Sequence, residues 1–493
     1  MRTIKVGSMV GIDKTEIDKL IAEKKFIGLN KSPRNEEVII SLTSYDKRIH
    51  DVKYTIYSLL NQTFPADKLI LWLDEDSFPQ REENLPQDLL ALKEFGLTID
   101  WCENLRPYKK LIPALEKYPD AIIATADDDI FYDTNWLGLL YEERLKYPDC
   151  VIAHRCRYLL MDTQENILPY TDWYVEVTPQ SPKYKNFFTG AGGVLYAKNF
   201  FKGDILRKDI FMELIPIADD IWFWAMAVLN GTKIKIPSNP LRHLIYVDTD
   251  MQTGSENLYS QNKTQNDEHL QKVFEKYPEL INVLIRENVE DKPYISIILL
   301  LKDVDKFNEN FINTFKQNFP EFEVIVVNVG TQFKSPTLPM NFRFINYPGG
   351  SDMDALNIGL RKAEGEYILF QDENSKLPRY GLSIVAQRTK DSQADVIHFA
   401  GHKQFSDEKF ILDDAPELKN DKPALLDKTR EKRAVLWFKD KLSGYLDTKI
   451  FRREFLTENG IKFEDDISDF MFQALIKADK YLIVPQAFCF CKD

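Results

Sequence analysis

Residues 121–132 read AIIATADDDIFY, an apolar run that is followed almost at once by three aspartates. A short apolar run of this kind is typical of a strand buried in a parallel sheet. The carboxylates are therefore expected at the edge of a sheet rather than in a free loop. Carboxylate oxygens hold Mg²⁺ or Mn²⁺ and leave coordination positions for phosphate oxygens. The stretch predicts a divalent metal site at Asp127, Asp128 and Asp129, although acidic triples also occur as solvated turns.

Strand and helix patterns alternate on the N-terminal side of this stretch. Apolar runs at 38–42, 68–73 and 97–101 predict strands, and helical spacing of apolar residues predicts helices at 52–60 and 110–117. This alternation predicts an α/β fold with a mostly parallel sheet. Ligands bind at the carboxyl ends of the strands in such sheets. We therefore expect Thr43, Asp74 and the three aspartates to gather on one rim.

The second half of the chain repeats the pattern. It predicts strands at 294–300, 323–328 and 367–370 and a helix at 354–364. With 493 residues the chain is too long for one hydrophobic core, and the two halves read as diverged copies of one architecture. We expect four segments: an N-terminal extension without assigned chemistry (1–34), a first domain (35–265), a helical linker (266–292) and a second domain (293–493).

Composition narrows the function classes. Hydrophobic residues make up 44% and charged residues 29% of the chain, as in soluble globular proteins. A net charge of -13 without a basic stripe argues against a nucleic-acid partner. The five cysteines form no zinc spacing, and Cys489 and Cys491 are expected to be core residues or free thiols in a reducing compartment. Because no segment has the length of a signal peptide or membrane helix, we expect a cytoplasmic protein, with peripheral attachment to the inner membrane left open.

Two further segments carry candidate ligand contacts. An ammonium of Lys109 or Lys110 is suited to neutralise a diphosphate, while a solvated lysine pair is equally consistent with the sequence. Gly190, Gly192 and Gly193 permit a close approach of the backbone to a ligand, and a tight turn before a strand is nearly as good an interpretation.

Three segments of the first half resemble one known family. They read ISLTSY (40–45), YKKLIPA (108–114) and TADDDIFY (125–132), and they look like bacterial GT-A-type, family-2-like glycosyltransferases of capsule and lipopolysaccharide assembly. The resemblance covers roughly 37–265. It implies a GT-A fold, a nucleotide-sugar donor that is often UDP-linked, and a DxD-type metal site at the three aspartates.

The same resemblance implies roles for individual residues. Thr43, Tyr45 and Asp74 would face the nucleoside, and Asp127 and one of the two lysines would contact the donor. Asp220 would be the base that deprotonates the attacking hydroxyl, and Asp219 would position the acceptor, although acidic residues at a helix start are also ordinary caps. His243 lies where some members of the resembled family have a third metal ligand, but a lone histidine is more often structural. Trp222 and Trp224 fit core packing better than sugar stacking.

The second half also resembles the family, in AEGEYILF (363–370) and in residues 451–463. Its acidic motif, however, reads DENS at 372–375, and Asn328 to Thr331 replace the acidic turn that would bind the nucleoside. Loss of carboxylates removes charge that a divalent ion needs. Asp465 and Asp466 remain at the expected base position. We expect a degenerate copy that binds the acceptor or mediates assembly.

The sequence thus predicts a metal-dependent, inverting glycosyltransferase of the hexosyltransferase type that uses Mn²⁺ or Mg²⁺. It would move a sugar from a nucleotide-sugar donor to a glycan or lipid-linked acceptor in surface polysaccharide synthesis. Three alternatives remain: a bifunctional enzyme with both domains active, a nucleotidyltransferase, and a non-catalytic carbohydrate-binding scaffold. A nucleotidyltransferase would typically have a glycine-rich phosphate loop after the first strand, and this sequence has no glycine there, which argues against that alternative.

Overall fold

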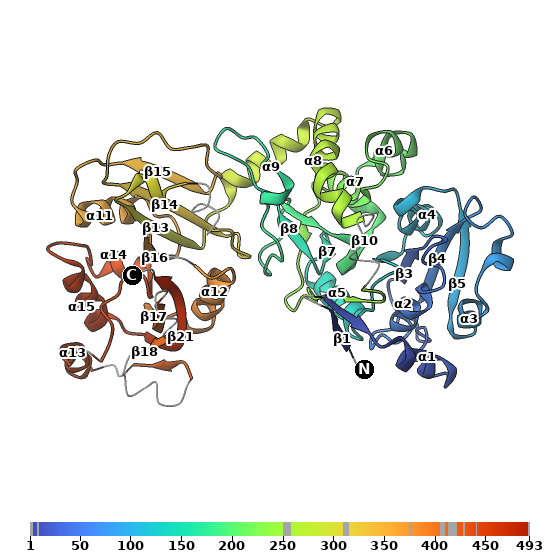
Figure 1. Cartoon of the computed structure of the whole chain (residues 1–493), viewed down its shortest axis with the longest axis horizontal. Helices are drawn as coiled ribbons and strands as arrows, with labels where there is room; N and C mark the ends of the chain where they lie inside the picture. Colours follow the sequence, from blue (N-terminus) through green and yellow to red (C-terminus); the bar gives the residue numbers. More distant parts are fainter. Residues whose placement is uncertain are drawn as a thin grey trace. The chain divides into compact units, whose positions relative to one another are not determined.

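The computed structural model describes residues 3–6, 9–249, 258–308, 315–374, 377–404, 410–412, 422–426, 429–439 and 441–491. Contacts divide the chain into two compact units. The first contains Met1–Leu159 and Pro169–Glu287, and the second contains Leu160–Leu168 and Asn288–Asp493. Each unit is a layered arrangement of a sheet and helices (Figure 1).

The first unit is built on a seven-stranded sheet in the order β11-β7-β10-β6-β3-β4-β5. These strands are β3 (Val38–Thr43), β4 (Lys68–Asp74), β5 (Leu97–Cys102), β6 (Ile122–Ala126), β7 (Val151–Ala153), β10 (Val194–Ala197) and β11 (Ile234–Lys235). Strand β3 pairs in parallel with β4 and β6, and β4 pairs in parallel with β5. The expected α/β class is confirmed, and the carboxyl ends of β3, β4 and β6 share one edge.

Strand β10 brings a distant loop to that edge. It runs antiparallel to β6, with Val194 opposite Thr125. Because the two strands run in opposite directions, the start of β10 lies beside the end of β6. The loop 190–193 is therefore adjacent to the three aspartates.

Helices cover this sheet (Figure 1). They are α2 (Val52–Leu59), α3 (Gln87–Ala91), α4 (Ile112–Lys117), α5 (Trp136–Lys146), α6 (Lys208–Leu214) and α7 (Asp219–Leu229), while α8 (Leu258–Lys276) packs against α6 and α7 and is followed by α9 (Glu279–Glu290). The helix expected from Lys110 begins at Ile112 instead, because Pro113 has no amide to donate and suits a first helical turn. Trp222 and Trp224 are fully buried in α7, so both serve the core.

The second unit repeats the first. Its strands are β13 (Ile295–Leu301), β14 (Phe322–Asn328), β15 (Phe342–Asn346), β16 (Tyr367–Asp372), β17 (Val396–Gln404), β18 (Phe410–Leu412), β19 (Ala424–Leu425), β20 (Lys449–Arg452) and β21 (Tyr481–Cys491). The path β15-β14-β13-β16-β20-β17-β21 matches the path of the first sheet strand for strand. The strand directions also match, with β20 antiparallel to both neighbours as β10 is. The two halves therefore share one topology, as the sequence pattern predicted.

The N-terminal segment is packed against the first unit. Strands β1 (Thr3–Val6) and β2 (Met9–Ile12) form a three-stranded sheet with β12 (Ile245–Tyr246). Helix α1 (Lys14–Ala22) is capped by the Asp13 carboxylate. A small core joins this segment to α2 and β12, and its buried members are Ile12, Ile17, Tyr54, Tyr57 and Val247.

We expect Ile17→Ala to lower the free energy of unfolding of the first unit by about 2–5 kcal/mol, because Ile17 is fully buried in this small core. Six of the seven tryptophans lie in the first unit, so tryptophan fluorescence during urea unfolding reports on it. The control is Ile27→Ala, since Ile27 is 54% exposed and should shift unfolding by roughly 0.5 kcal/mol or less. Equal effects of the two substitutions would show that the segment does not pack as described.

Candidate active site

The three aspartates lie at the end of β6, on the edge shared with β3 and β4. The Asp127 amide donates to the Tyr132 hydroxyl oxygen at 2.8 Å, which fixes the start of the turn. The Asp127 side chain is 28% exposed and that of Asp128 is 8% exposed. The strand end thus presents one accessible carboxylate and one that is almost enclosed.

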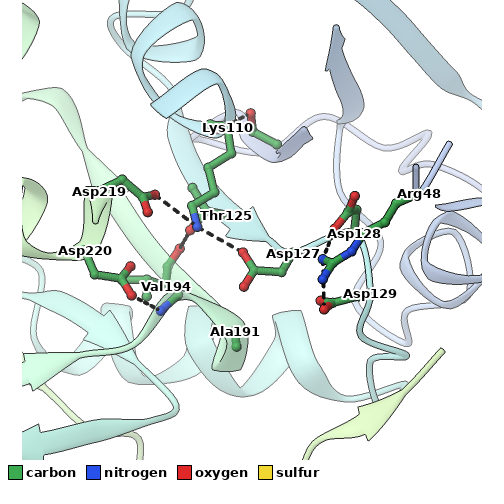
Figure 2. Close-up of polar contacts among 12 residues, drawn as sticks. Arg48, Lys110, Thr125, Asp127, Asp128, Asp129, Ala191, Val194, Asp219 and Asp220 are labelled. Atoms are coloured by element: carbon green, nitrogen blue, oxygen red, sulfur yellow. Dashed lines mark hydrogen bonds and ion pairs between the residues drawn. The ribbon is translucent and has the colours of Figure 1, made fainter. Parts of the chain in front are cut away.

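Arg48 bridges Asp128 and Asp129 (Figure 2). Its guanidinium lies 2.9 Å from Asp128 Oδ1 and 2.9 Å from Asp129 Oδ2. The Ser44 hydroxyl donates to the second Asp128 oxygen at 2.5 Å. Burial raises the pKa of Asp128, against the opposing effect of Arg48. Burial alone would lower the pKa of Arg48, but Asp128 and Asp129 together raise it.

Lys110 is the centre of a second group of charges. Its ammonium lies 2.9 Å from Asp127 Oδ1 and 3.1 Å from Asp219 Oδ2 (Figure 2). The Lys110 side chain is 8% exposed. Burial would lower its pKa, yet Asp127 and Asp219 hold the pKa well above the usual value. Lys110 therefore joins the end of β6 to the start of α7.

Asp220 completes this group from the first turn of α7. The amide of Gly190 donates to Asp220 Oδ2 at 2.9 Å. The other oxygen, Oδ1, is buried and has no hydrogen-bond partner within the described part of the chain. Burial, followed by repulsion from Asp219, raises the pKa of Asp220 to about 7. A carboxyl group with this pKa can accept a proton and return it near neutral pH.

The glycine loop leaves room for these side chains. A Cβ on Gly190 would lie 2.8 Å from Lys110 Nζ and 2.9 Å from Asp220 Oδ1. Gly193 has φ +92°, and a Cβ there would lie 2.2 Å from Trp136 Nε1. Position 193 therefore requires glycine, a side chain at position 190 would displace Lys110 or Asp220, and the backbone of the loop forms a wall of the site.

The two neighbouring lysines have different partners. Lys109 makes an ion pair with Asp74, and both side chains are buried. Asp74 also accepts from the Ser77 amide at 2.8 Å. We expected Asp74 to face a nucleoside and either lysine to reach a diphosphate. In this structure Asp74 is fully buried, so Asp74 and Lys109 satisfy each other and Lys110 alone of the two lysines lies among the strand-end aspartates.

Thr43 and Tyr45 follow β3, as the pattern predicted. The Thr43 hydroxyl donates to the Trp72 carbonyl oxygen at 2.8 Å, so this hydrogen bond links the neighbouring strands β3 and β4. Tyr45 is 39% exposed, and the Arg48 guanidinium lies 5.6 Å from its ring centre. An exposed ring beside the strand end is suited to stack on a planar group such as a nucleobase.

The expected set of four metal ligands does not come together. His243 is exposed and lines an open cleft of about 440 Å³ with Arg242, whereas none of the three aspartates lines that cleft. Across the described ranges, no three or more histidine, cysteine, aspartate or glutamate side chains are arranged to hold a metal ion. Arg48 already engages Asp128 and Asp129, so these residues do not fit a preformed divalent site.

Sequence reasoning missed several residues of this region. Lys14 lies 3.0 Å from Asp51 and 3.2 Å from Asp248, so the N-terminal segment contributes a charge beside the site. The Val247 amide donates to the Asp129 carbonyl oxygen at 2.9 Å, which attaches the β12 segment to the aspartate turn. The sequence could have indicated Arg48, because it follows the end of β3 by five residues and is therefore expected near the edge of the sheet that carries the site. Nothing in the sequence could have indicated Lys14, since its partners are distant in sequence.

Among the residues described at the matching edge of the second unit, no such buried charge centre is found. Lys302 pairs with Asp352 and the Lys306 ammonium donates to Asn374, and all of these groups are exposed. Asp466 accepts from the Asp469 amide and caps α15 (Ile467–Lys477), which is a structural role. Asn328 donates to the Thr331 carbonyl oxygen and accepts from the Gly330 amide, so it closes a turn.

Comparisons with known proteins give weak matches. No family model matches the sequence. A curated protein of Bacillus subtilis (strain 168), described as the uncharacterized glycosyltransferase EpsJ, is 24% identical over 189 residues. The match covers 36% of this chain and 52% of the relative, so the chain spans about half the length of that relative.

Solved structures are similar over part of the chain. Residues 1–349 of S. aureus TarS match with 22% identity and a TM-score of 0.33, over 40% of this chain and 60% of that one. The mannosyltransferase PcManGT from Pyrobaculum calidifontis, in complex with GDP-Man and Mn²⁺, matches with 16% identity and a TM-score of 0.28, over 41% of this chain and 57% of that one. Among the helices that the structure describes, none is long and apolar enough to cross a membrane.

We expect Lys110→Met to lower the free energy of unfolding of the first unit by about 3–5 kcal/mol, because it leaves buried carboxylates without their cation. Urea unfolding followed by tryptophan fluorescence measures this change. Lys117→Met is the control, since the Lys117–Asp100 pair is half exposed on the lysine side, and its loss should cost about 1 kcal/mol or less. A Lys110→Met protein as stable as the control would contradict the charge arrangement described here.

Proposed function

We propose that the chain is a glycosyltransferase whose active site is the group of carboxylates around Lys110. It transfers a sugar from a nucleotide-sugar donor, often UDP-linked in the resembled family, to a hydroxyl of a glycan or lipid-linked acceptor. One observation carries the proposal: a strand-end carboxylate, Asp127, and a helix-start carboxylate, Asp220, converge beside Gly190, where the buried Lys110 ammonium pairs with Asp127 and with Asp219, the neighbour of Asp220. The description of the relative EpsJ supports the same class of reaction.

Asp220 is the proposed general base. In an inverting transfer the acceptor oxygen bonds to the anomeric carbon while the bond from that carbon to the diphosphate oxygen breaks. The acceptor proton passes to the Asp220 carboxylate. The Gly190 amide fixes Oδ2, and Oδ1 has no hydrogen-bond partner in the described part of the chain, so Oδ1 is the oxygen available to the proton.

The neighbouring residues hold the base in place. Lys110 and Asp219 fix the start of α7 against the end of β6, and the proposed role of Asp219 is to position the acceptor hydroxyl. Asp127 is the most accessible of the three strand-end carboxylates and faces the donor side in this proposal. The exposed Tyr45 ring is the proposed platform for the nucleobase. Because the residues do not fit a preformed metal site, we assign no step to Mn²⁺ or Mg²⁺.

The second unit is proposed to be non-catalytic and to bind the acceptor or mediate assembly. Its strand-end groups are exposed pairs and caps, in contrast to the buried carboxylates of the first unit. A role in surface polysaccharide synthesis and attachment to a membrane surface stay predictions of the sequence.

We expect Asp127→Asn and Asp220→Asn each to reduce the release of nucleoside diphosphate, Asp220→Asn by roughly 10²-fold or more because general base catalysis contributes at least that factor. The assay separates the nucleotide products of the purified protein after incubation with a panel of nucleotide sugars. Asp372→Asn is the matched control at the equivalent strand end of the second unit and should release product at the rate of the unmodified protein. Variants at 127 and 220 with unchanged rates would exclude this site, and pyrophosphate as product would indicate nucleotidyl transfer.

We expect kcat/KM to rise tenfold per pH unit below pH about 7 and to level off above it. The pKa of Asp220 is raised to about 7, and a base acts only in its deprotonated form, so activity is lost as pH falls through that value. The pH profile of initial rates with the best donor measures this. In Asp220→Asn the residual rate should lose the inflection. A profile that is flat between pH 5 and 8 would show that another group is the base.

A further inference from the structure

The position of Arg48 bears on how this site handles a divalent ion. A single guanidinium nitrogen, Nη1, lies 2.9 Å from an oxygen of Asp128 and 2.9 Å from an oxygen of Asp129. The Arg48 side chain is 16% exposed, so the contact is largely shielded from water. Charge-assisted hydrogen bonds of this kind are among the stronger polar contacts in proteins. The carboxylates that the sequence offers to a metal are therefore engaged by a cation of the protein itself.

The surroundings of Arg48 carry excess negative charge. A small cavity of about 10 Å³ is lined by Arg48, Asp51, Asp128, Asp129, Val247 and Asp248. Lys14 contacts two of these carboxylates, Asp51 and Asp248. The lining thus holds four carboxylates and one guanidinium, and the Lys14 ammonium contacts two of the carboxylates. The cavity has about the volume of one water molecule, so the charge favours a divalent ion while the closed geometry leaves it little space.

The Arg48 guanidinium also lies near an aromatic ring beside the cavity. The Arg48 guanidinium carbon is 5.6 Å from the centre of the Tyr45 ring, and Tyr45 is 39% exposed. An arginine over an aromatic face is stabilised by the ring quadrupole. The ring contact therefore adds to the two carboxylates in holding the guanidinium in its present position.

We propose that Arg48 is the resident counter-ion of the Asp128–Asp129 pair and takes the place of a divalent ion there, so that the unmodified protein holds no divalent ion on these two carboxylates. This inference deepens the proposed glycosyltransferase function and rests on it. It explains why the aspartates do not fit a preformed metal site although their number and position suit one.

The test is a titration of the whole 493-residue chain with Mn²⁺ alone, with free Mn²⁺ measured by electron paramagnetic resonance. Arg48→Met should bind Mn²⁺ at least about tenfold more tightly than the unmodified protein, because the competing cation is gone. Arg48→Lys should fall between the two, since one ammonium replaces the guanidinium. Arg48→Met combined with Asp129→Asn should lose the gain. The control is Arg81→Met, because Arg81 also pairs with a carboxylate, Glu75, but outside this cavity, and it should bind as the unmodified protein does.

An Arg48→Met protein that binds Mn²⁺ no more tightly than the unmodified protein would overturn the inference. Circular dichroism verifies the fold of each variant. If Arg48→Met does not fold, the Mn²⁺ affinity of Arg48→Lys is the deciding measurement. An Arg48→Lys protein with the Mn²⁺ affinity of the unmodified protein would then contradict the inference. Release of nucleoside diphosphate is assayed in parallel on the unmodified protein. If the unmodified protein turns over a donor but Arg48→Met gains no Mn²⁺ affinity, only the inference is contradicted. If Arg48→Met gains Mn²⁺ affinity but the unmodified protein turns over no donor, the proposed function is contradicted.

Discussion

The buried ammonium of Lys110 holds the candidate site together. It contacts Asp127 at the end of β6 and Asp219 at the start of α7, and these two elements are otherwise separated by the glycine loop. A charge of this kind is costly to bury alone and is stable here only because carboxylates surround it. Burial and repulsion from Asp219, which Lys110 holds at the start of α7, raise the pKa of the proposed base Asp220, whereas the Lys110 charge itself lowers it.

The two units show how one topology can carry different strand-end chemistry. Seven strands follow the same order and directions in both sheets, yet the first sheet ends in buried, paired carboxylates and the second in exposed pairs and caps. Sheet formation depends on the apolar strand interiors, which both halves retain. The residues beyond the strand ends are free of that constraint, so they could diverge without loss of the fold.

The N-terminal segment is part of the first unit rather than a separate extension. Residues 1–34 carry no recognisable chemistry in sequence, but β2 pairs with β12 and Lys14 contacts Asp51 and Asp248. Strand β12 in turn leads to Val247, which is hydrogen-bonded to the aspartate turn. The segment therefore stabilises the outer wall of the site. Together with Arg48, it leaves the three aspartates more enclosed and better neutralised than their sequence suggests.

The sequence by itself determined the α/β class, the repeat of the pattern and the position of the aspartates at a strand end, because each depends on apolar periodicity within a few residues. It also indicated the acidic pair at 219–220. Only the tertiary structure decided how the charges pair. Lys109 and Lys110 are neighbours in sequence but have separate partners, and Arg48 and Asp128 are 80 positions apart. Ion pairs form between groups that folding brings within a few ångströms, and local patterns contain no record of such long-range contacts.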